Sequence, residues 1–546
     1  MKSIAVLLCI LAGPAVGAPA PADEIAHELQ LPAALAEVSG GERLLLRNQV
    51  VSAYQGRGDQ PIWTDDQRPL PAAWKMLGAI HSADDDALRP EDYHLRALDG
   101  LFASLRVADP PEDARERQLA ALDILLSDAF LLYSQHEQNG RVNLSDQDPS
   151  LTHHMHGDDP RDNLRLVAAG ADPADMLRSI APSTAYYAGL RAALLNYRVI
   201  AASGGFPVVP AGMPPQLKAG DPRVQVLIER LRAEGDLAQA TGITDADLTA
   251  ALQHFQTRNG LAPTGVIDAA TLAALNVPVQ ARIDEIRVNM ERLRWLPHRP
   301  APTRLVVNIA NFRAALYQNG KLRMSEPVVV GTPFRQTPEF RDHIQYLVVN
   351  PVWDVPSLIT TQDLLPRLQA DPGYLSAHGY QVVEGWGDAA HPVASDAIDW
   401  KRWTPDDLPY HLRQLPGPEN ALGRVKFMFP NRFGIYLHDT PAQGLFAEDN
   451  RAFSSGCIRV ADALDLAEAI LRVDGQAGAH QLLQDALAAG TPQQIALQHP
   501  ISIYIVYFTA WADRDGTVEF RNDIYDRDVE ILHALDAASP RYSRRR

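Results

Sequence analysis

Cysteine is nearly absent from this chain of 546 residues, which has only two, Cys9 and Cys457. So few cysteines exclude a small scaffold held together by several disulfides. Cys9 lies in an N-terminal segment that we expect to be removed, which would leave Cys457 without a partner. An unpaired thiol in an exported protein is either buried in a core or chemically reactive. The residues around Cys457 must decide between these two interpretations.

Basic residues are also in short supply, with 50 Lys and Arg against 67 Asp and Glu and a formal net charge of −17. This balance speaks against a protein that binds nucleic acid without regard to sequence, because such binding needs a basic face. Internal repeats and low-complexity tracts are absent as well. The hydrophobic content of 46% allows sizeable cores, and the length predicts about three or four domains.

Long hydrophobic runs are missing except near the N-terminus, in MKSIAVLLCILAGPAVGAPAPADE. Lys2 provides a positive start, residues 4–12 form an apolar run, and a site of the A-x-A kind ends at residue 18. We interpret residues 1–18 as a signal peptide that sends the protein to the periplasm; the alternative is an uncleaved membrane anchor. Leu8 before Cys9 speaks against a lipoprotein signal, which needs a small residue there.

Apolar residues at three- and four-residue spacing predict a helical scaffold over residues 24–205. A Pro- and Gly-rich stretch then leads into a compact unit over residues 222–278. Asn259-Gly260 should end one of its amphipathic helices, and Asp268 should cap the next. The unit resembles the small three-helix peptidoglycan-binding domain of wall enzymes; the alternative is a helical spacer that touches no wall. The matching residues are Phe255, Gln256, Gly260, Leu261, Thr264, Gly265, Asp268, Thr271 and Leu275.

Alternation with a period of two begins near residue 304 and predicts a β-rich domain over residues 303–477, with Asn319-Gly320 as a hairpin turn. The segment 358–422 is too long for a loop and should be folded or functional. Its tryptophans either line a groove or pack in a core: Trp386, Trp400 and Trp403. Residues 478–537 should pack on the scaffold or on the β-rich domain. The fold class we predict is multidomain α+β.

His438 ends an apolar strand, and Cys457 follows it in the segment S-S-G-C-I-R. A nucleophilic thiol needs a base within hydrogen-bond reach, and the base needs an orienting group. Gly456 permits an unusual turn, which could direct backbone amides at a developing oxyanion. Arg459, two residues beyond the thiol on an extended segment, could bind a carboxylate or could hold the turn in place.

This pattern resembles the L,D-transpeptidase catalytic domain: a histidine, fifteen residues, then [S/T]-x-G-C-[I/V]-R. Further blocks resemble the long Gram-negative members of that family: NFRAALYQNGK, PVVVGTPFRQTP, NPVWDVP, QLPGPENALGRVKFMFPNRFGIYLHDTPAQGLF and FTAWADRDGTVEFRNDIYDRD. Segments around Trp63 and Tyr93 fit the same family. The chain departs from many members at Ser455, where they have a histidine.

The resemblance implies a role for each residue of this segment. Cys457 would be the nucleophile and His438 the general acid and base. The backbone carbonyl of Asp439 would orient His438, although its carboxylate could instead complete a triad. Ser455 and Gly456, with Cys457 itself, would supply the amides of the oxyanion hole. The expected substrate-binding residues are Arg459, Ser454 and Tyr436.

The resemblance also implies the reaction. The enzyme would release D-Ala from a peptidoglycan stem peptide and form a 3→3 cross-link between diaminopimelic acid residues, beneath a capping insertion. Such chemistry needs no metal, cofactor, nucleotide or nucleic acid; wall synthases would be partners, and carbapenems would acylate Cys457. The alternatives are a cysteine hydrolase acting as an L,D-carboxypeptidase or endopeptidase, and an inert wall-binding scaffold. The loop with His153, His154 and His156 could hold zinc but is better explained as a polar surface loop.

Overall fold

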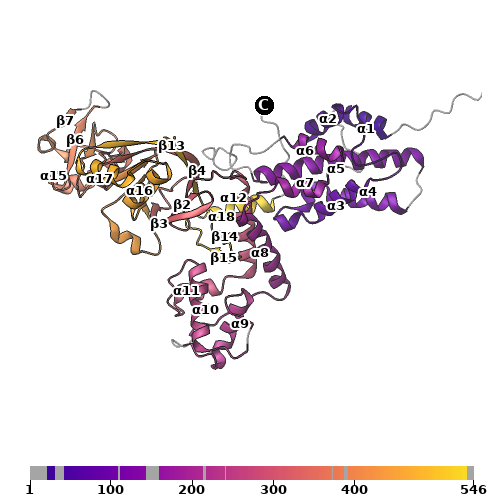
Figure 1. Ribbon diagram of the computed structural model, residues 1–546, viewed down its shortest axis with the longest axis horizontal. Helices are drawn as coiled ribbons and strands as arrows, with labels where there is room; N and C mark the ends of the chain where they lie inside the picture. Colours follow the sequence, from indigo (N-terminus) through magenta and orange to yellow (C-terminus); the bar gives the residue numbers. More distant parts are fainter. Residues whose placement is uncertain are drawn as a thin grey trace, which may run out of the picture.

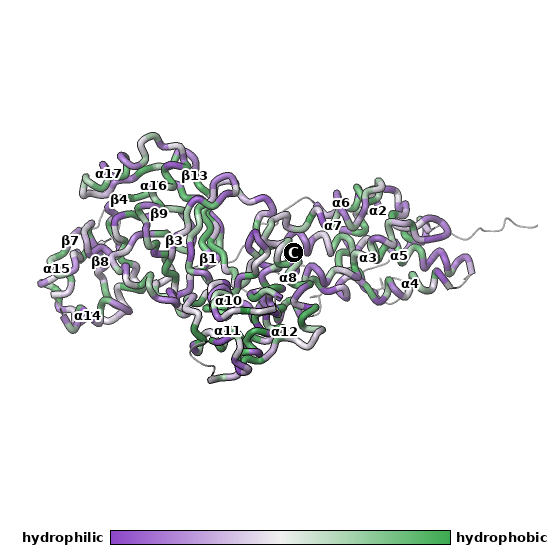
Figure 2. Tube along the Cα trace, turned by 60° about the horizontal axis from the view of Figure 1, so that its bottom comes forward, coloured by the Kyte–Doolittle hydropathy of each residue, from purple (hydrophilic) through white to green (hydrophobic). Residues whose placement is uncertain are grey.

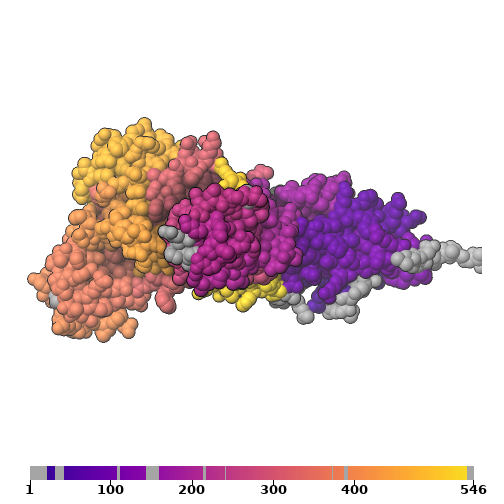
Figure 3. All heavy atoms as spheres, turned by 90° about the horizontal axis from the view of Figure 1, so that it is seen from below, coloured from indigo at the N-terminus to yellow at the C-terminus, as the bar shows by residue number. Residues whose placement is uncertain are grey.

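The computed structural model describes residues 21–30, 42–107, 111–142, 159–212, 217–239, 241–371, 373–385 and 391–537. The expected signal peptide, the three histidines of the 153–156 loop and Trp386 lie outside these ranges. N-terminal helices occupy one end of the molecule, a large sheet occupies the other, and a small helical unit lies between them (Figures 1 and 3). Within the described ranges, none of the helices has the length and apolar character needed to cross a bilayer. The predicted multidomain α+β class is confirmed.

The N-terminal scaffold is built around one long helix, α5 (Glu112–Asn139), whose side chains are buried over most of its length. Buried Asp123 on α5 accepts hydrogen bonds from the backbone of Ile62 and Trp63, each at 2.8 Å, which ties the preceding loop to the helix. The other scaffold helices surround α5 or follow it: α1 (Pro21–Gln30), α2 (Arg47–Gln55), α3 (Pro71–His81), α4 (Leu95–Val107), α6 (Pro160–Ala168), α7 (Pro173–Ile180) and α8 (Ala185–Ala202).

The small helical unit contains α9 (Gln225–Ala233), α10 (Asp245–Arg258) and α11 (Ala269–Leu275) around its own apolar cluster. Gly260 follows α10 with a φ of +68°, and Asp268 caps α11 by accepting from the Thr271 amide at 2.7 Å. Both predicted helix boundaries are therefore confirmed.

The β-rich part is a nine-stranded sheet in the order β11-β3-β12-β10-β9-β4-β13-β1-β2. Because β2 also pairs with β3, the sheet closes on itself. Hydrophobic residues follow the strands near β1 (Figure 2), and α16 (Ala463–Val473) and α17 (Ala479–Ala488) pack against the same core. The strands are β1 (Arg304–Asn308), β2 (Arg313–Gln318), β3 (Lys321–Gly331), β4 (Phe340–Val349), β9 (Val425–Met428), β10 (Leu437–His438), β11 (Ala452–Ser454), β12 (Ile458–Val460) and β13 (Gln493–Val506).

The sheet extends beyond the expected boundary at residue 477, because β13 pairs with both β1 and β4. Residues 479–506 of the C-terminal segment therefore belong to the β-rich part. The remainder, with the hairpin β14 (Ala510–Ala512) and β15 (Val518–Phe520) and helix α18 (Arg527–Asp536), packs on α8 and on α12 (Val279–Arg294).

The insertion between β4 and β9 folds around an apolar cluster of its own. Trp400 is 2% exposed and lies in that cluster, which settles its role as a core residue. Trp403 packs against the same cluster. The insertion comprises the four strands β5 (Trp353–Asp354), β6 (Tyr380–Glu384), β7 (His391–Val393) and β8 (Tyr410–Gln414), and the short helices α13 (Ser357–Ile359), η5 (Thr360–Leu364), α14 (Leu365–Ala370) and α15 (Tyr374–Ala377).

Buried ion pairs on α12 join the scaffold to the C-terminal segment. Arg294 is fully buried and lies 3.4 Å from Glu137 of α5 and 3.3 Å from Glu291. Arg292 pairs at 2.5 Å with Asp528 of α18. Removing one partner of such a pair typically costs about 3–5 kcal/mol, because the other charge stays buried. The domains are thus fixed to one another through α12.

Candidate active site

His438 lies on strand β10, which is an inner strand of the sheet between β12 and β9. It pairs in parallel with β12, with His438 opposite Arg459, and antiparallel with β9, with His438 opposite Lys426. Because side chains alternate along a strand, these three side chains share the face opposite Leu437, which is buried in the core. The amide of Ile458 donates to the carbonyl of Tyr436 at 3.1 Å. One residue earlier in the same parallel register, Tyr436 lies beside Cys457. Cys457 is therefore a diagonal neighbour of His438.

Cys457 ends a tight turn between β11 and β12. Gly456 has a φ of +110°, a conformation that other residues adopt only with strain. Ser454 fixes the turn from within: its hydroxyl donates to the Cys457 carbonyl at 2.5 Å and accepts from the Gly456 amide at 3.1 Å. Buried Thr337 donates to the Gly456 carbonyl at 2.8 Å. The turn is therefore held by side chains that sit behind it.

The imidazole of His438 is buried, and its Nδ1 lies 2.6 Å from the carbonyl oxygen of Asp439. A carbonyl oxygen only accepts hydrogen bonds, so Nδ1 carries the proton and Nε2 keeps a free lone pair. The Asp439 carboxylate faces elsewhere and accepts from the Arg424 amide at 2.8 Å. This arrangement favours orientation of His438 by the backbone over orientation by a triad carboxylate.

Burial and charge keep the imidazole neutral. Burial lowers the pKa of His438 to about 3, with help from the positive charges of Arg459 and Lys426 and against the opposing effect of the Asp439 carbonyl. Burial also raises the pKa of Cys457, although hydrogen bonds from Tyr436 and the charges of Arg459 and Lys426 oppose that shift. The resting site thus holds a neutral thiol and a neutral base, without a preformed ion pair.

Two cations on this face, Arg459 and Lys426, make no ion pair among the described residues. The buried Nε of Arg459 has no hydrogen-bond partner there, and Lys426 feels the charge of Asp354 without pairing with it. Burial lowers the pKa of both groups, which means that their charges are incompletely solvated. Lys426 also lies 5.6 Å from the ring centre of Tyr436. Such a face is suited to an anionic group placed next to the thiol.

The insertion reaches the catalytic turn through Arg335. Its guanidinium donates to Ser455 Oγ at 2.9 Å, to Asp363 of η5 at 2.7 Å and to Gln362 at 2.8 Å. The side chain of Trp353, at the start of the insertion, also approaches Tyr436 and partly offsets the burial that raises the pKa of its hydroxyl. The insertion therefore meets the residues around Cys457 at two places.

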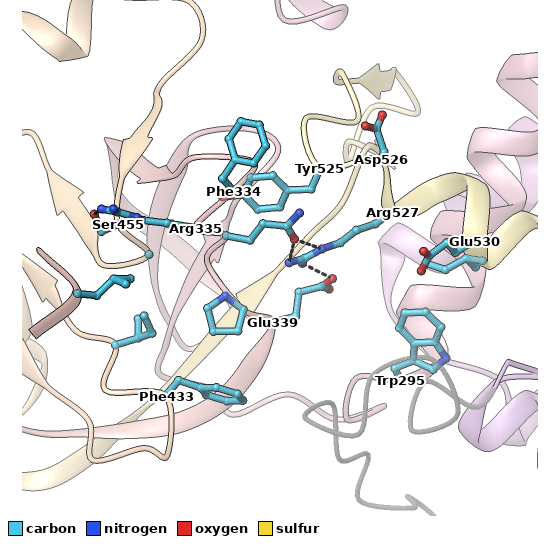
Figure 4. Close-up of a pocket in the computed structure, with 16 residues that line it drawn as sticks. Trp295, Phe334, Arg335, Glu339, Phe433, Ser455, Tyr525, Asp526, Arg527 and Glu530 are labelled. Carbon is cyan, nitrogen blue, oxygen red and sulfur yellow. Dashed lines mark hydrogen bonds and ion pairs between the residues drawn. The ribbon is translucent and has the colours of Figure 1, made fainter. Parts of the chain in front are cut away.

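Ser455 and Gly456 also border a pocket of about 710 Å³. Trp295 and Glu530 line the side of the pocket that is formed by helices (Figure 4). Arg527 also lines the pocket and pairs there with Glu339 at 2.9 Å. The pocket provides open space beside the catalytic turn in which part of a substrate could lie.

The structure thus brings together the candidate active-site residues of the sequence analysis: Cys457, His438, Asp439, Ser454, Ser455, Gly456, Arg459 and Tyr436. Sequence reasoning missed Lys426, Arg335 and Thr337. Lys426 left one signal, since it stands between the core residues Val425 and Phe427 on a strand and must face the other side. Arg335 and Thr337 lie in a loop whose approach to the turn had no local signal.

Three family models match the chain. The L,D-transpeptidase catalytic domain matches residues 302–495, the scaffold domain matches residues 48–194, and the domain described as "Putative peptidoglycan binding domain" matches residues 220–275. These matches fall on the β-rich part, the N-terminal helices and the small helical unit, respectively.

One curated relative, described as "Putative L,D-transpeptidase" from Haemophilus influenzae, is 36% identical over 247 residues. The match covers 45% of this chain and 48% of the relative, so the chain spans about half the length of that relative. The crystal structure of an L,D-transpeptidase from Xylanimonas cellulosilytica is 14% identical and covers 54% of this chain and 99% of that one, with a TM-score of 0.17. A score this low carries no argument. Residues 302–495 therefore match the L,D-transpeptidase catalytic domain family, in a chain that also matches a scaffold domain and a peptidoglycan-binding domain.

Proposed function

We propose that this protein is a peptidoglycan L,D-transpeptidase that forms 3→3 cross-links through a thioester on Cys457. The observation that carries the proposal is the neutral His438, whose Nδ1–H is committed to the Asp439 carbonyl and whose Nε2 is left as the base on the face shared with Cys457. The family match of the domain supports the same chemistry.

In the first half-reaction, His438 Nε2 takes the proton of the Cys457 thiol as sulfur attacks the carbonyl of a diaminopimelic acid at position three of the stem peptide. The tetrahedral intermediate collapses to a thioester. The bond to the D-Ala at position four breaks, and the leaving amine takes the proton from the imidazolium.

In the second half-reaction, the side-chain amine of a diaminopimelic acid on another stem attacks the thioester. His438 takes the proton of that amine and returns it to the departing sulfur. The product is an amide between two diaminopimelic acid residues, and the free thiol is restored. No oxidant or cofactor enters this balance.

Backbone amides would stabilise the oxyanion of both intermediates. The Gly456 amide already donates to Ser454 Oγ, so the amides of Ser455 and Cys457 are the better candidates. Arg459, together with Lys426, would bind a carboxylate of the stem peptide, because neither cation makes an ion pair among the described residues. Tyr436, which lies beside Cys457 in the strand register, would line the donor site.

The test is incubation of the purified full chain with a defined disaccharide tetrapeptide, followed by mass spectrometry of products and protein. We expect cross-linked dimers, release of D-Ala and a thioester adduct on Cys457, and none of these with Cys457→Ala. Shortened monomers without dimers would indicate a hydrolase, since the acyl-enzyme is shared and only the acceptor differs. Unchanged products with Cys457→Ala would refute covalent catalysis, and no products with the intact chain would favour an inert scaffold.

Two further proposals follow from the same chemistry. Carbapenems should acylate Cys457, which intact-mass analysis of the protein would detect. The substrate lies in the cell wall, so the protein should act in the periplasm, alongside the synthases that supply uncross-linked stems. The match to a peptidoglycan-binding domain supports the wall as the binding partner.

A further inference from the structure

A second open site lies on the other side of the closed sheet from His438. Its cavity measures about 800 Å³, and its walls come from the start of α8, the segment after α12, the outer face of β1 and β2, and the β14–β15 hairpin. Thr257 of α10, in the matched peptidoglycan-binding domain, also lines it. In the closed sheet, three strands separate β1 from β10 in either direction. This site is therefore remote from Cys457.

Arginine is the commonest charged residue in the walls, and we call this site the arginine groove. It contains five arginines, Arg299, Arg304, Arg313, Arg514 and Arg521, but only two carboxylates, Asp513 and Glu519.

Of the five arginines, Arg521 alone makes an ion pair within the described residues, with Glu519 at 2.8 Å. Arg304, Arg313 and Arg514 donate only to backbone carbonyls, at 2.9, 3.3 and 3.0 Å. In a chain with a net charge of −17, this local positive excess attracts an anionic ligand.

Aromatic rings lie among these arginines. The guanidinium of Arg304 lies 4.6 Å from the ring centre of Tyr317, and that of Arg521 lies 4.7 Å from the ring centre of Trp511. Tyr186 of α8 faces Tyr317 across the groove, with their hydroxyls 3.4 Å apart. Aromatic faces supply large apolar contact areas for the C–H-rich faces of sugar rings, and they leave the guanidinium N–H groups free to bind carboxylates.

We propose that the arginine groove binds a peptidoglycan strand, with its sugars against the aromatic rings and the carboxylates of its acidic stem peptides against the arginines. The inference rests on the proposed function and adds a second subsite to it. A strand is favoured over a small anion by the size of the cavity and by its position between the small helical domain and the catalytic domain. The groove would hold the strand while one of its stems reaches Cys457.

The test measures binding of the full chain carrying Cys457→Ala, so that no turnover occurs. The probe is soluble, uncross-linked peptidoglycan strands with intact stem peptides, titrated by calorimetry at low and high salt. The groove variant is Arg299→Gln with Arg514→Gln, because both side chains are exposed and neither is part of a buried core. Its matched control is Arg43→Gln with Arg96→Gln, two exposed scaffold arginines that give the same change in charge.

We expect the groove variant to bind about tenfold more weakly and with less dependence on salt, whereas the control binds like the parent. Strands stripped of their stem peptides should also bind about tenfold more weakly to the parent. Trp511→Ala should weaken binding of stripped and intact strands alike. Equal affinity of the groove variant and the parent would overturn the proposal. So would a DNA oligonucleotide that competes as well as the strand, since that would indicate a general polyanion site.

Failure of this inference can be distinguished from failure of the proposed function. With Cys457 intact, the groove variant should form the thioester with a short tetrapeptide at the rate of the parent, because that donor does not reach the groove. Loss of the thioester in the parent chain would refute the catalytic proposal but would leave the strand-binding result standing on its own.

Discussion

Lowering the pH from about 7.5 to about 5.5 should leave the rate of Cys457 acylation almost unchanged. An ordinary histidine titrates in this interval, and an enzyme that relies on one as a base loses activity there. In this protein, burial and the neighbouring cations Arg459 and Lys426 lower the pKa of His438 to about 3. The base should therefore stay in its working form well into the acid range.

The size of the effect follows from the two pKa values. With an ordinary pKa of about 6.5, roughly nine-tenths of the imidazole would be protonated at pH 5.5, and the rate would fall about tenfold. With a pKa of about 3, less than about 1% is protonated, and the rate should change by less than about twofold. The two cases differ by a factor that a single-turnover experiment resolves easily.

The assay is the first-order rate of thioester formation with a defined tetrapeptide, followed by intact-mass spectrometry across the acid range. Circular dichroism at each pH must show that the chain stays folded. Removing a nearby charge with Lys426→Met should raise the pKa of His438 and move the acid limb upwards. His438→Gln should abolish the rate at every pH. A tenfold loss centred between pH 6 and 7 in the folded parent would refute the argument that burial sets this pKa.

Three further predictions concern the turn, the insertion and the scaffold. Gly456→Ala should destabilise the fold by about 1–3 kcal/mol in thermal unfolding, because a φ of +110° is strained for alanine. The same change should slow thioester formation about tenfold or more. An unchanged rate would contradict the role of the turn. Arg335→Met should release Asp363, so amide hydrogen exchange in residues 357–364 should rise while exchange in the scaffold stays as it was; Asp363→Asn is expected to do the same. In the scaffold, burial alone would lower the pKa of His94, but hydrogen bonds to Asp128 and Glu42 raise it to about 9. The contribution of His94 to the free energy of unfolding is therefore complete below about pH 6.5 and is lost as the pH rises through about 9. His94→Gln should cost about 3–5 kcal/mol of stability at pH 6 and clearly less at pH 10. A cost that does not change with pH in unfolding experiments would exclude this ion pair as the cause.

Local signals in the sequence were sufficient for much of the active site. The alternation of residues 436–439 predicted that the Asp439 carboxylate would point away from His438, and the structure places that carboxylate on the Arg424 amide. Turn chemistry at Gly456 and the helix caps at Asp268 and Gly260 were equally readable. In each case the decisive contact lies within a few residues of the signal.

Contacts between distant segments could not be predicted in the same way. The parallel pairing of β13 with β1 joins residues about 200 positions apart, and alternation in each strand names no partner. Lys426 acquires its place beside His438 only through the register of β9 and β10. Arg335 reaches Ser455 across 120 positions. The positions of Lys426 and Arg335 depend on strand register and tertiary contacts, which local sequence propensity does not encode.

The buried ion pairs on α12, which we call the joint, give these distant contacts a functional consequence. Arg294 of α12 is buried against Glu137 of the scaffold, so replacing either residue would leave the other charge buried without its partner. The arginine groove depends on the same joint, because Tyr186 comes from α8 of the scaffold whereas Arg514 comes from the C-terminal hairpin. If the groove holds the strand, a full-length variant that loosens the contact of Arg294 with Glu137, such as Glu137→Gln, should still form the thioester with a short peptide yet cross-link long strands poorly.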